Sequence, residues 1–561
     1  MTIRVETENG KSLLDILRER QIYIDAPCGG SGNCGRCRVR FLEGAPEPVE
    51  KEKRLLSEKE LAEGIRLACA ARPQGTCTVE LPSQREEEMA VLVGSKITDE
   101  KTSNIEDEKR QGSGMGAAET SVKPEKKTAA ETAGTTRRAA GYGVAVDIGT
   151  TTLAASLLDL AGGRRIATAS AVNHQRAYGA DVISRIQAAC DGAGEALQRS
   201  ICADIGELLG RLTEKAEVLA EAVSEIVIAG NTTMCHLLRG LSCAGLGAAP
   251  FTPEDISLWE GCAKEFPGLS AWNARMTVLP GISAFVGADI VAGIYGSGMD
   301  LEESNLLLDI GTNGEMAIGG REGFLVTSAA AGPVFEGGNI ECGVPGVPGA
   351  VAKIALRLTD DEKTGKAAGD LHRNCESGGR REVRLVTTVC ETIGGGAPVG
   401  LCGTGIIDVM GELVRLGLVD ENGTLEEPWF SEGVKLAGEK LRFTEADIRQ
   451  IQMGKSAIRA GIETLLEKAG KADFGKVCVA GGFGSYLNVE QAIRIGMFPE
   501  TFAGRVEMLG NSALAGAEKY LLADRREAAA RMDKIIQKAT EINLAMDAGF
   551  NDRYLSYMFF A

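Results

Sequence analysis

The first eighty residues alternate between apolar and polar positions in the way that a small α+β unit does. Ile3 and Val5 alternate with polar residues, as in a half-buried strand. Ser12 can cap a short helix that carries Leu and Ile on one face over residues 13–17. A loop rich in Gly and Cys follows, then the strand-like run RVRFLEG, and the unit closes with TVELP. The pattern predicts a separate small domain over residues 1–83.

Residues 84–140 lack this patterning. The run from Ser103 to Gly141 is polar, poor in aromatic side chains and without hydrophobic periodicity. Such a segment cannot bury enough apolar surface to offset the entropy lost on ordering. We interpret residues 84–140 as a flexible linker, with a poorly patterned small domain as the alternative.

From residue 141 to residue 561 the pattern changes to α/β. Strand-like apolar runs, namely GVAVDIG, EIVIAGN, NLLLDIG and KVCVAGG, alternate with amphipathic helical stretches. One helix is expected to begin near Ala180 with four apolar side chains on one face: Val182, Ile183, Ile186 and Ala189.

The strand runs contain an internal repeat. Two of them end alike, in Asp147-Ile-Gly-Thr-Thr-Thr and in Asp309-Ile-Gly-Thr-Asn-Gly. Two others also match each other, Ile228-Ala-Gly-Asn and Val479-Ala-Gly-Gly. This order indicates a duplicated unit. It predicts two similar lobes, about 141–300 and 301–561, with a cleft between them.

Four cysteines form the first candidate site. Cys28, Cys34 and Cys37 are spaced C-x5-C-x2-C, and Cys69 is the fourth candidate. Iron–sulfur clusters need thiolates that converge from a loop, and the interspersed glycines permit a tight path that exposes backbone N–H groups to sulfur. The plant-type pattern is C-x4-C-x2-C with a distant fourth Cys, so the first gap here is one residue longer. The spacing predicts a [2Fe–2S] cluster.

Two alternatives to this ligand set stay open. A four-cysteine zinc site usually pairs two C-x2-C knuckles, and only one is present here. Cys77 competes with Cys69 for the fourth position. We favour Cys69 because it lies in LACAARP, just before the last strand, as in plant-type ferredoxins.

The repeated Asp-Ile-Gly-Thr runs form the second candidate site. A strand that ends in this tetrad and turns into a second strand is a phosphate-binding hairpin, because Gly and Thr let N–H and hydroxyl groups approach phosphate oxygens. Asp147 and Asp309 can hold Mg2+, often through water. Two such hairpins from opposite lobes would clamp the phosphates of ATP, with tight turns of no function as the alternative. The expected phosphate contacts are Gly149, Thr150, Thr151, Gly311, Thr312 and Asn313.

A late glycine run completes the predicted nucleotide site. Gly481 and Gly482 follow a strand run, where a backbone-lined adenosine pocket would lie. An ordinary turn is an equal alternative for this run alone. Glu336 has two interpretations as well: a contact to the nucleotide or the lobe hinge, and a plain residue at a helix start.

Composition and net charge limit the kinds of partner that the protein is expected to bind. The net charge of −17 and the lack of a Lys/Arg block argue against nucleic acid. The sequence contains no run of about 18 apolar residues, so no membrane span is predicted. The N-terminus also lacks a signal pattern, and a cytoplasmic location is therefore expected. There the 15 cysteines are not expected to form a disulfide framework. The scattered His174, His236 and His372 are expected in core or surface roles.

At this point the sequence resembles a known family. The last 420 or so residues are similar to the superfamily of acetate and sugar kinases, heat-shock chaperone ATPases and actin, and the first 82 resemble [2Fe–2S] ferredoxins. The combination resembles the reductive activators of corrinoid-dependent methyltransferases and corrinoid iron–sulfur proteins. Further matching stretches are Gly230–Met234, Gly287–Ile290, Ala331–Pro333 with Glu336–Gly338, and Leu401–Gly405, which adds Gly403 to the expected nucleotide contacts.

The resemblance implies both a fold and a function. The fold is α/β overall, with a β-grasp ferredoxin domain, the linker and a two-lobed, actin-like ATPase. The implied activity is ATP-dependent reduction of inactive Co(II) to Co(I), with a [2Fe–2S] cluster, ATP and Mg2+ as cofactors. The implied partners are a corrinoid protein and a low-potential electron donor. The sequence leaves the oligomeric state open, with a homodimer as the state to test.

Two departures from that family are visible. Some activators have a middle domain between ferredoxin and ATPase, whereas only a linker is expected here. Others carry C-terminal Cys clusters for [4Fe–4S] centres, and no cysteine follows Cys478. The aromatic tail FNDRYLSYMFFA is expected to pack against its own lobe.

Three other functions stay open: a small-metabolite kinase with a redox-sensing ferredoxin, a nucleotide-gated binding module, and an electron donor to another low-potential acceptor. A tethered electron carrier favours the activator, because neither a kinase nor a filament needs one.

Overall fold

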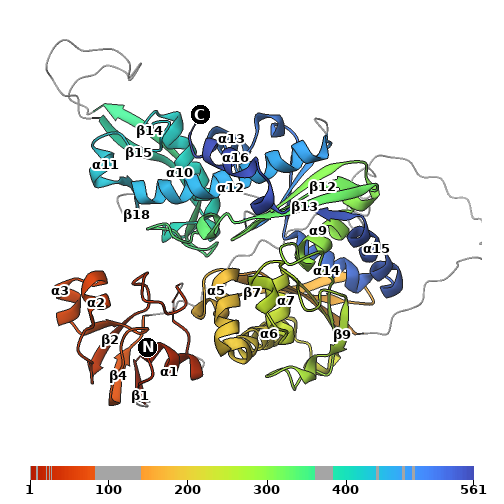
Figure 1. Cartoon of the computed structure of the whole chain (residues 1–561), viewed down its shortest axis with the longest axis horizontal. Coiled ribbons are helices and arrows are strands. Elements are labelled where there is room, and N and C mark those ends of the chain that lie inside the picture. The colour runs from red at the N-terminus through yellow and green to blue at the C-terminus, as the bar shows by residue number, and fades with distance from the viewer. Residues whose placement is uncertain are drawn as a thin grey trace, which may run out of the picture.

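The computed structural model describes residues 2–7, 10–20, 22–24, 26, 28–82, 141–360, 383–437, 441–470, 474–482 and 487–560. Figure 1 shows three parts: a red N-terminal unit, a yellow and green lobe beside it, and a green to blue lobe above. The linker expected over residues 84–140 lies outside the described residues, as does His372.

The N-terminal unit is a four-stranded sheet in the order β1-β4-β2-β3. The Ser12 hydroxyl accepts the backbone N–H of Asp15 and so caps helix α1, as predicted. The buried side chains of α1 pack on strand residues such as Val39 and Val79 and form a core of their own. The elements are β1 (Thr2–Thr7), α1 (Leu13–Glu19), β2 (Arg38–Glu43), α2 (Glu50–Leu55), α3 (Glu58–Ala62), β3 (Ile65–Leu67) and β4 (Gly75–Glu80).

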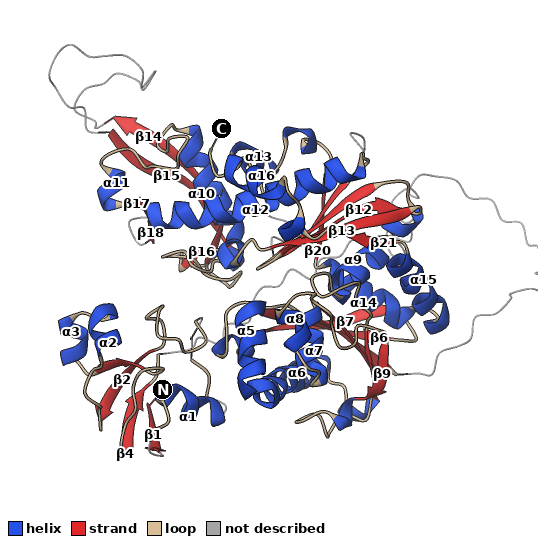
Figure 2. Cartoon of the chain, in the orientation of Figure 1, coloured by secondary structure: helices blue, strands red, loops and turns tan. Residues whose placement is uncertain are grey.

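Each lobe is built on a six-stranded sheet, and the two sheets share one plan (Figure 2). The orders are β7-β6-β5-β8-β10-β9 and β20-β19-β11-β12-β13-β21. In each sheet three consecutive strands form an antiparallel meander, and its first strand, β5 or β11, pairs in parallel with a later one, β8 or β19. This common topology confirms the predicted duplication and the α/β, actin-like fold class.

The elements of the first lobe are β5 (Tyr142–Ile148), β6 (Thr152–Asp159), β7 (Arg164–Val172), α5 (Val182–Ala188), α6 (Gly194–Ala216), β8 (Val223–Gly230), α7 (Thr232–Arg239), α8 (Ala244–Gly247), β9 (Trp259–Cys262), β10 (Arg275–Val278) and α9 (Ala288–Ser297). Those of the second are β11 (Asn305–Ile310), β12 (Gly314–Gly320), β13 (Gly323–Ala329), β14 (Ala350–Asp360), β15 (Val383–Thr392), β16 (Gly400–Leu401), α10 (Gly403–Arg415), α11 (Trp429–Glu432), β17 (Val434–Leu436), β18 (Leu441–Phe443), α12 (Glu445–Ala469), β19 (Val477–Gly481), α13 (Val489–Arg494), β20 (Val506–Gly510), α14 (Ser512–Leu522), α15 (Arg525–Gln537), β21 (Ala539–Glu541) and α16 (Phe550–Ser556).

Helices from both halves of the sequence share one core. Leu514 and Leu521 of α14 belong to the same buried cluster as Val144 of β5 and Ile294 of α9. Small residues bring α9 and α14 together, since a Cβ built on Gly296 would lie 2.9 Å from the backbone nitrogen of Gly516 on α14. The lobe boundary near residue 300 therefore separates two parts of the sequence, but helices from both sides of it pack in one core.

The C-terminal tail packs on its own lobe, as expected. Phe560 is buried in the second-lobe core beside α12. The ammonium of Lys455 on α12 donates to the backbone carbonyls of Tyr557 and Phe559 at 2.6 and 2.7 Å. Burial lowers the pKa of Lys455 to about 7. The tail is thus anchored by hydrogen bonds from the buried Lys455 as well as by its aromatic rings.

The helix expected near Ala180 is present as α5, and three of the four predicted apolar residues, Val182, Ile186 and Ala189, pack against the core, whereas the prediction for Ile183 is wrong. Ile183 is 72% exposed, whereas the guanidinium-bearing Arg185 is fully buried. Helix α5 ends at Ala188, and the chain kinks at Gly192, where φ is +100°. The apolar pattern therefore predicts most of the buried face, but it does not reveal the burial of Arg185.

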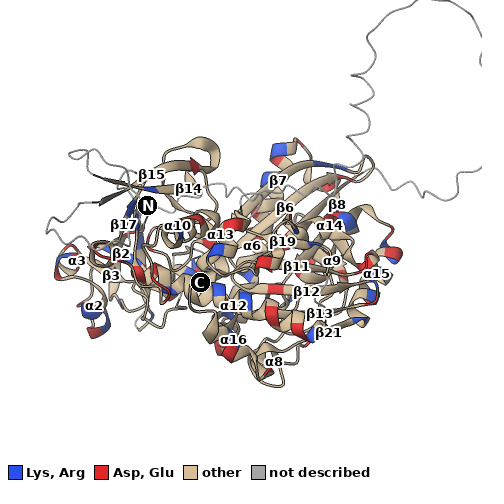
Figure 3. Cartoon of the chain, turned by 90° about the horizontal axis from the view of Figure 1, so that it is seen from above, with Lys and Arg blue, Asp and Glu red and all other residues tan. Residues whose placement is uncertain are grey.

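Surface charges are mixed. Lys and Arg lie interspersed with Asp and Glu on most elements, including α2 and α3 (Figure 3). None of the helices in the described part of the chain has the length and apolarity that a membrane span needs.

Candidate functional site

Four cysteine thiols converge in two pairs at one end of the N-terminal sheet. The Sγ atoms of Cys28 and Cys34 lie 3.3 Å apart. Cys37 and Cys69 form the second pair, whose thiols share a hydrogen bond. The backbone N–H of Ala68 donates to the carbonyl of Cys37 at 2.8 Å, which holds the second pair together. Cys77 lies elsewhere, buried on β4 opposite Val5 of β1.

The paired arrangement fits a two-iron cluster better than one zinc ion. Each iron of a four-cysteine [2Fe–2S] cluster takes two thiolates, whereas a structural zinc takes four on a single centre. The donor set therefore suits the cluster, and it favours Cys69 over Cys77.

The loop around Cys28 is prepared for a thiolate. Burial opposes ionisation of this thiol, but hydrogen bonds from the Ser31 hydroxyl and from the backbone of Asn33 and Gly30 outweigh it and lower the pKa to about 6. Gly29 and Gly30 adopt φ values of +66° and +103°, which only glycine adopts without strain. The first gap thus contains a left-handed glycine turn, and the backbone of Gly30 and Asn33 bonds the sulfur of Cys28.

A deep cleft separates the two lobes, and the two Asp-Ile-Gly-Thr loops face each other across it. The cleft is open to solvent and is lined by residues of both lobes. Every nucleotide contact expected from the sequence lines it: Asp147, Gly149, Thr150, Thr151, Asp309, Gly311, Thr312, Asn313, Gly403, Gly481 and Gly482.

Strand pairing brings the two aspartates to equivalent positions. Asp147 is next to last in β5 and lies opposite Ala229 of β8, while Asp309 holds the same place in β11, opposite Ala480 of β19. The carboxyl ends of parallel strands lie at one edge of a sheet, so both loops open toward the cleft. Gly481 permits this close approach, since a Cβ there would lie 2.4 Å from the carbonyl oxygen of Ile310.

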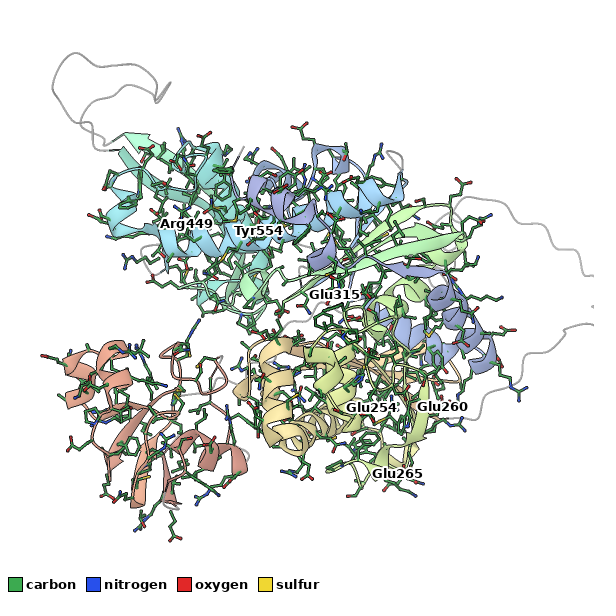
Figure 4. All side chains as sticks on the ribbon, viewed as in Figure 1. Glu254, Glu260, Glu265, Glu315, Arg449 and Tyr554 are labelled. Atoms are coloured by element: carbon green, nitrogen blue, oxygen red, sulfur yellow. The ribbon has the colours of Figure 1, made fainter. Side chains whose placement is uncertain are left out.

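Further polar residues that the sequence did not single out as site residues also line the cleft, among them Asp289, Glu315 and Asn511. Figure 4 labels Glu315 where the two lobes meet. Asn511 donates to Asp147 at 2.7 Å and caps α14, as Asn231 caps α7 in the first lobe. That shared strand–Asn–helix pattern could have identified Asn511. Glu315 has no counterpart in the first repeat and gave no such signal.

The acidic cluster of Asp147, Asp289, Asp309 and Glu315 resists full ionisation. Burial, and then the neighbouring carboxylates Asp289 and Asp147, raise the pKa of Asp309 to about 8. Burial raises the pKa of Asp147 to about 7 and that of Asp289 to about 6, and it raises the pKa of Glu315 as well. In the described part of the chain, no Lys or Arg lines the cleft. A bound divalent cation would relieve this repulsion and bridge the carboxylates to phosphates, so the site fits Mg2+ with a nucleotide.

Glu336 joins the two loops directly. Its carboxylate accepts hydrogen bonds from the hydroxyls of Thr151, at 2.8 Å, and Thr312. The two hydroxyl oxygens are themselves 3.1 Å apart. Of the two interpretations of Glu336, its contacts favour the one that places it between the lobes. Glu336 also ends a short 3-10 turn, Pro333–Glu336.

Models of three protein families match successive parts of the chain. Residues 1–74 match the 2Fe-2S iron-sulfur cluster binding domain. Residues 142–302 match the RACo middle region, and residues 303–561 match the C-terminal domain of RACo, the ASKHA domain. The expectation that the chain lacks a middle region is therefore wrong. The segment assigned to the first lobe is that region, and it was missed because it carries the same Asp-Ile-Gly-Thr strand pattern as the second lobe.

Individual relatives match over most of the chain. It is 32% identical over 445 residues to the corrinoid activation enzyme RamQ of Eubacterium limosum, covering 74% of this chain and 69% of that protein. It is 26% identical to the [Co(II) methylated amine-specific corrinoid protein] reductase of Methanosarcina barkeri, covering 74% and 76%. A solved structure of a reductive activator for corrinoid, iron-sulfur protein superposes with a TM-score of 0.65 at 26% identity, covering 99% of this chain and 96% of that one.

The ferredoxin unit, the duplicated lobes and the cleft between them thus occur in the order of these families. The chain belongs to the RACo family of ferredoxin-linked ASKHA proteins.

Proposed function

We propose that this protein uses ATP to drive the one-electron reduction of the cobalt of a corrinoid protein from Co(II) to Co(I). The observation that carries the proposal is one chain that holds both a four-thiol site for a [2Fe–2S] cluster and an interlobe cleft with two phosphate loops. The names of its relatives, a corrinoid activation enzyme and a corrinoid protein reductase, support the choice of acceptor.

The residues divide into three roles. Cys28, Cys34, Cys37 and Cys69 hold the cluster. Asp147 and Asp309 organise Mg2+ from the two lobes. The loop residues 149–151 and 311–313 hold the phosphates, and Gly403, Gly481 and Gly482 border the adenosine.

Energetics explain why the two sites belong in one chain. A [2Fe–2S] cluster held by Cys28, Cys34, Cys37 and Cys69 would supply one-electron transfer: it would accept one electron from the donor and be reoxidised as Co(II) is reduced to Co(I). Plant-type clusters lie near about −400 mV, and the cobalt couple is expected to be lower. Each ~59 mV uphill lowers the equilibrium constant of a one-electron transfer tenfold. Closure of the lobes on ATP, at the loops that Glu336 joins, supplies the coupling.

The proposal extends to the surroundings of the protein. Its electron donor is a low-potential carrier, since it must reduce a cluster of this type. We place the protein in the cytoplasm, where the cysteines described as free thiols would stay reduced. We take a homodimer as the first oligomeric state to test in solution.

The test is anaerobic. The reduced protein is mixed with a Co(II) corrinoid protein, and the Co(I) absorbance is followed with and without Mg2+ and ATP. We expect Co(I) to accumulate only with ATP. Equal accumulation without ATP, or none with any corrinoid protein, would refute the proposal. Phosphorylation of a small metabolite without Co(I) would point instead to a kinase.

A further inference from the structure

One short segment of the first lobe contacts both the ferredoxin domain and a phosphate loop. It runs from Asn173 to Gly179, between β7 and α5, and is called the docking segment below. In Figure 1 the ferredoxin domain lies beside this end of the first lobe, next to α5.

The ferredoxin side of the contact is closely fitted. The ring of Tyr23 stacks on His174 at 4.9 Å between centroids, and the guanidinium of Arg18 lies 4.7 Å from the ring centre of Tyr178. Arg18 also donates to the carbonyls of Ala177 and, at 3.1 Å, Gly29.

The cluster loop itself takes part in this contact. Gly29 directly follows the cluster ligand Cys28, and a Cβ on Gly29 would lie 2.8 Å from the carbonyl oxygen of Tyr178. A contact with no room for a methyl group tolerates little displacement of either partner.

The other side of the docking segment holds the first phosphate loop by its backbone. The side chain of Asn173 donates to the carbonyl of Gly149 and its backbone N–H donates to that of Thr151, both at 2.9 Å. The buried Arg185 donates to the carbonyl of Thr150 at 2.6 Å and to that of Gly179, the end of the docking segment, at 2.9 Å. Three consecutive loop carbonyls are therefore bonded to the docking segment or to its anchor.

The segment is also rigid. His174 is held by Asp204 of α6 through its backbone N–H at 2.9 Å and its Nδ1 at 2.6 Å. The fully buried Gln175 donates to the carbonyl of Leu197 at 2.9 Å. A segment tied down at this many points transmits a displacement of the loop rather than absorbing it.

We propose that the docking segment couples the nucleotide cleft to the ferredoxin domain, so that nucleotide binding releases that domain from the first lobe. The inference rests on the proposed function only in requiring that the cleft binds nucleotide. Phosphates that enter between the loops place negative charge beside Glu336, which the Thr151 hydroxyl bonds. Thr151 must then shift, and the carbonyl bonds carry the shift to the tight contact at Tyr178 and Gly29. Release would free the Cys28 loop for a partner.

Linkage makes the coupling reciprocal. If nucleotide weakens docking, docking weakens nucleotide binding by the same factor, typically 5- to 150-fold. A variant that cannot dock should therefore bind nucleotide at least about 5-fold more tightly.

The test is hydrogen exchange on the cluster-loaded full chain, with and without Mg2+ and a non-hydrolysable ATP analogue. In the wild type we expect slower exchange of peptides that contain residues 149–152 and faster exchange of ferredoxin peptides that contain Tyr23 and Gly29. In Tyr178→Ala the loop response should persist, the ferredoxin peptides should exchange fast with or without nucleotide, and the Kd for the analogue should fall. Tyr178→Phe, which keeps the ring, should behave as the wild type, and so should Tyr554→Ala on the distant α16.

Each outcome is decisive. Ferredoxin peptides that ignore nucleotide while the loop responds would overturn the inference and leave the proposed function intact. A full ferredoxin response in Tyr178→Ala would overturn it as well. If the loop itself does not respond, the nucleotide site and the inference fail together. Should Tyr178→Ala not fold, Arg18→Gln serves the same purpose, with Arg40→Gln as its exposed control and the visible spectrum as the check on cluster content.

Discussion

The two Asp-Ile-Gly-Thr loops have the same sequence but different surroundings. In the first lobe the carbonyls of residues 149–151 accept hydrogen bonds from Asn173 and Arg185, which belong to or anchor the docking segment. Each loop also closes on itself: Gly311 donates to the carbonyl of Asn313 at 2.8 Å in the second lobe, as Gly149 donates to that of Thr152 at 3.0 Å in the first. Thr312 donates to Glu336 of its own lobe.

The difference shows that the duplication repeated the phosphate loop but not the contacts that the loop makes with the rest of the protein. Both loops line the cleft and bond Glu336, and among the described residues only the first is also tied to the ferredoxin domain, through Asn173–Gly179. A repeated motif thus predicts where a ligand is held, and the contacts behind the motif determine what responds to it. The predictions below first distinguish the effects of changes at the cluster site from those of changes in the two loops. They then distinguish the two loops from each other.

The largest effect on Co(I) formation is expected from a substitution at the cluster site, which leaves both phosphate loops unchanged. Cys34→Ala should abolish the [2Fe–2S] visible spectrum and all Co(I) formation, because one iron loses half of its thiolates. Nucleotide binding at both loops should be unchanged. Cys77→Ala, which removes a buried thiol outside the two pairs, is the control and should keep the spectrum. Retention of the full spectrum in Cys34→Ala would refute the ligand set.

Removal of either loop aspartate should come next. Asp309→Ala and Asp147→Ala should each lower ATP-dependent reduction by about 100-fold or more, because Mg2+ loses a carboxylate that orients it. Cluster content, measured by the visible spectrum, should be unchanged. If only one of the two variants is impaired, the functional equivalence of the loops is wrong.

A pH dependence should follow from the buried carboxylates. The pKa values of Asp147, about 7, and Asp309, about 8, are raised in the folded protein, which therefore keeps protons that the unfolded chain has lost. Without Mg2+ and nucleotide, stability should fall as the pH rises from about 4 through these values, by up to ~1.4 kcal/mol per unit for each group. Asp309→Asn should flatten that fall between pH 5 and pH 8 in urea unfolding. A slope equal to that of the wild type would contradict the raised pKa.

The smallest effect should come from single hydroxyls. Thr151→Val and Thr312→Val each remove one donor to phosphate, at about 1 kcal/mol, or roughly 5-fold in the Kd for nucleotide measured by calorimetry. Thr151→Ser and Thr312→Ser should restore binding. Only the Thr151 change is expected also to alter hydrogen exchange of the ferredoxin domain, and the same change in Thr312→Val would break the contrast between the loops.

Short motifs in the sequence were enough to predict much of the candidate site. Both loops, their aspartates and the cysteine set stand in short runs whose chemistry follows from residue type and spacing. Asp289 stands in the matching stretch Gly287–Ile290, but nothing in that stretch gave it a role in the site, and Glu315 directly follows the second loop; their place in the cleft depends on how the two sheets face each other.

Long-range packing was harder to predict. The partners of Arg185 come from Thr150 and Gly179, and no periodicity reveals that a guanidinium is fully buried there. Helix α14 packs in a core that begins some 370 residues earlier, at Val144, so the division near residue 300 could not anticipate it. The ferredoxin contact at Tyr178 likewise depends on tertiary placement alone.

The most direct test of the central claim is a single-turnover measurement of both redox centres. One equivalent of the reduced protein is mixed anaerobically with a Co(II) corrinoid protein, and the absorbance of the cluster and of Co(I) is recorded together before and after ATP is added. The account predicts that one cluster is reoxidised for each Co(I) formed, and that both changes begin with ATP. Co(I) that appears without cluster reoxidation, or to the same extent before ATP is added, would contradict it.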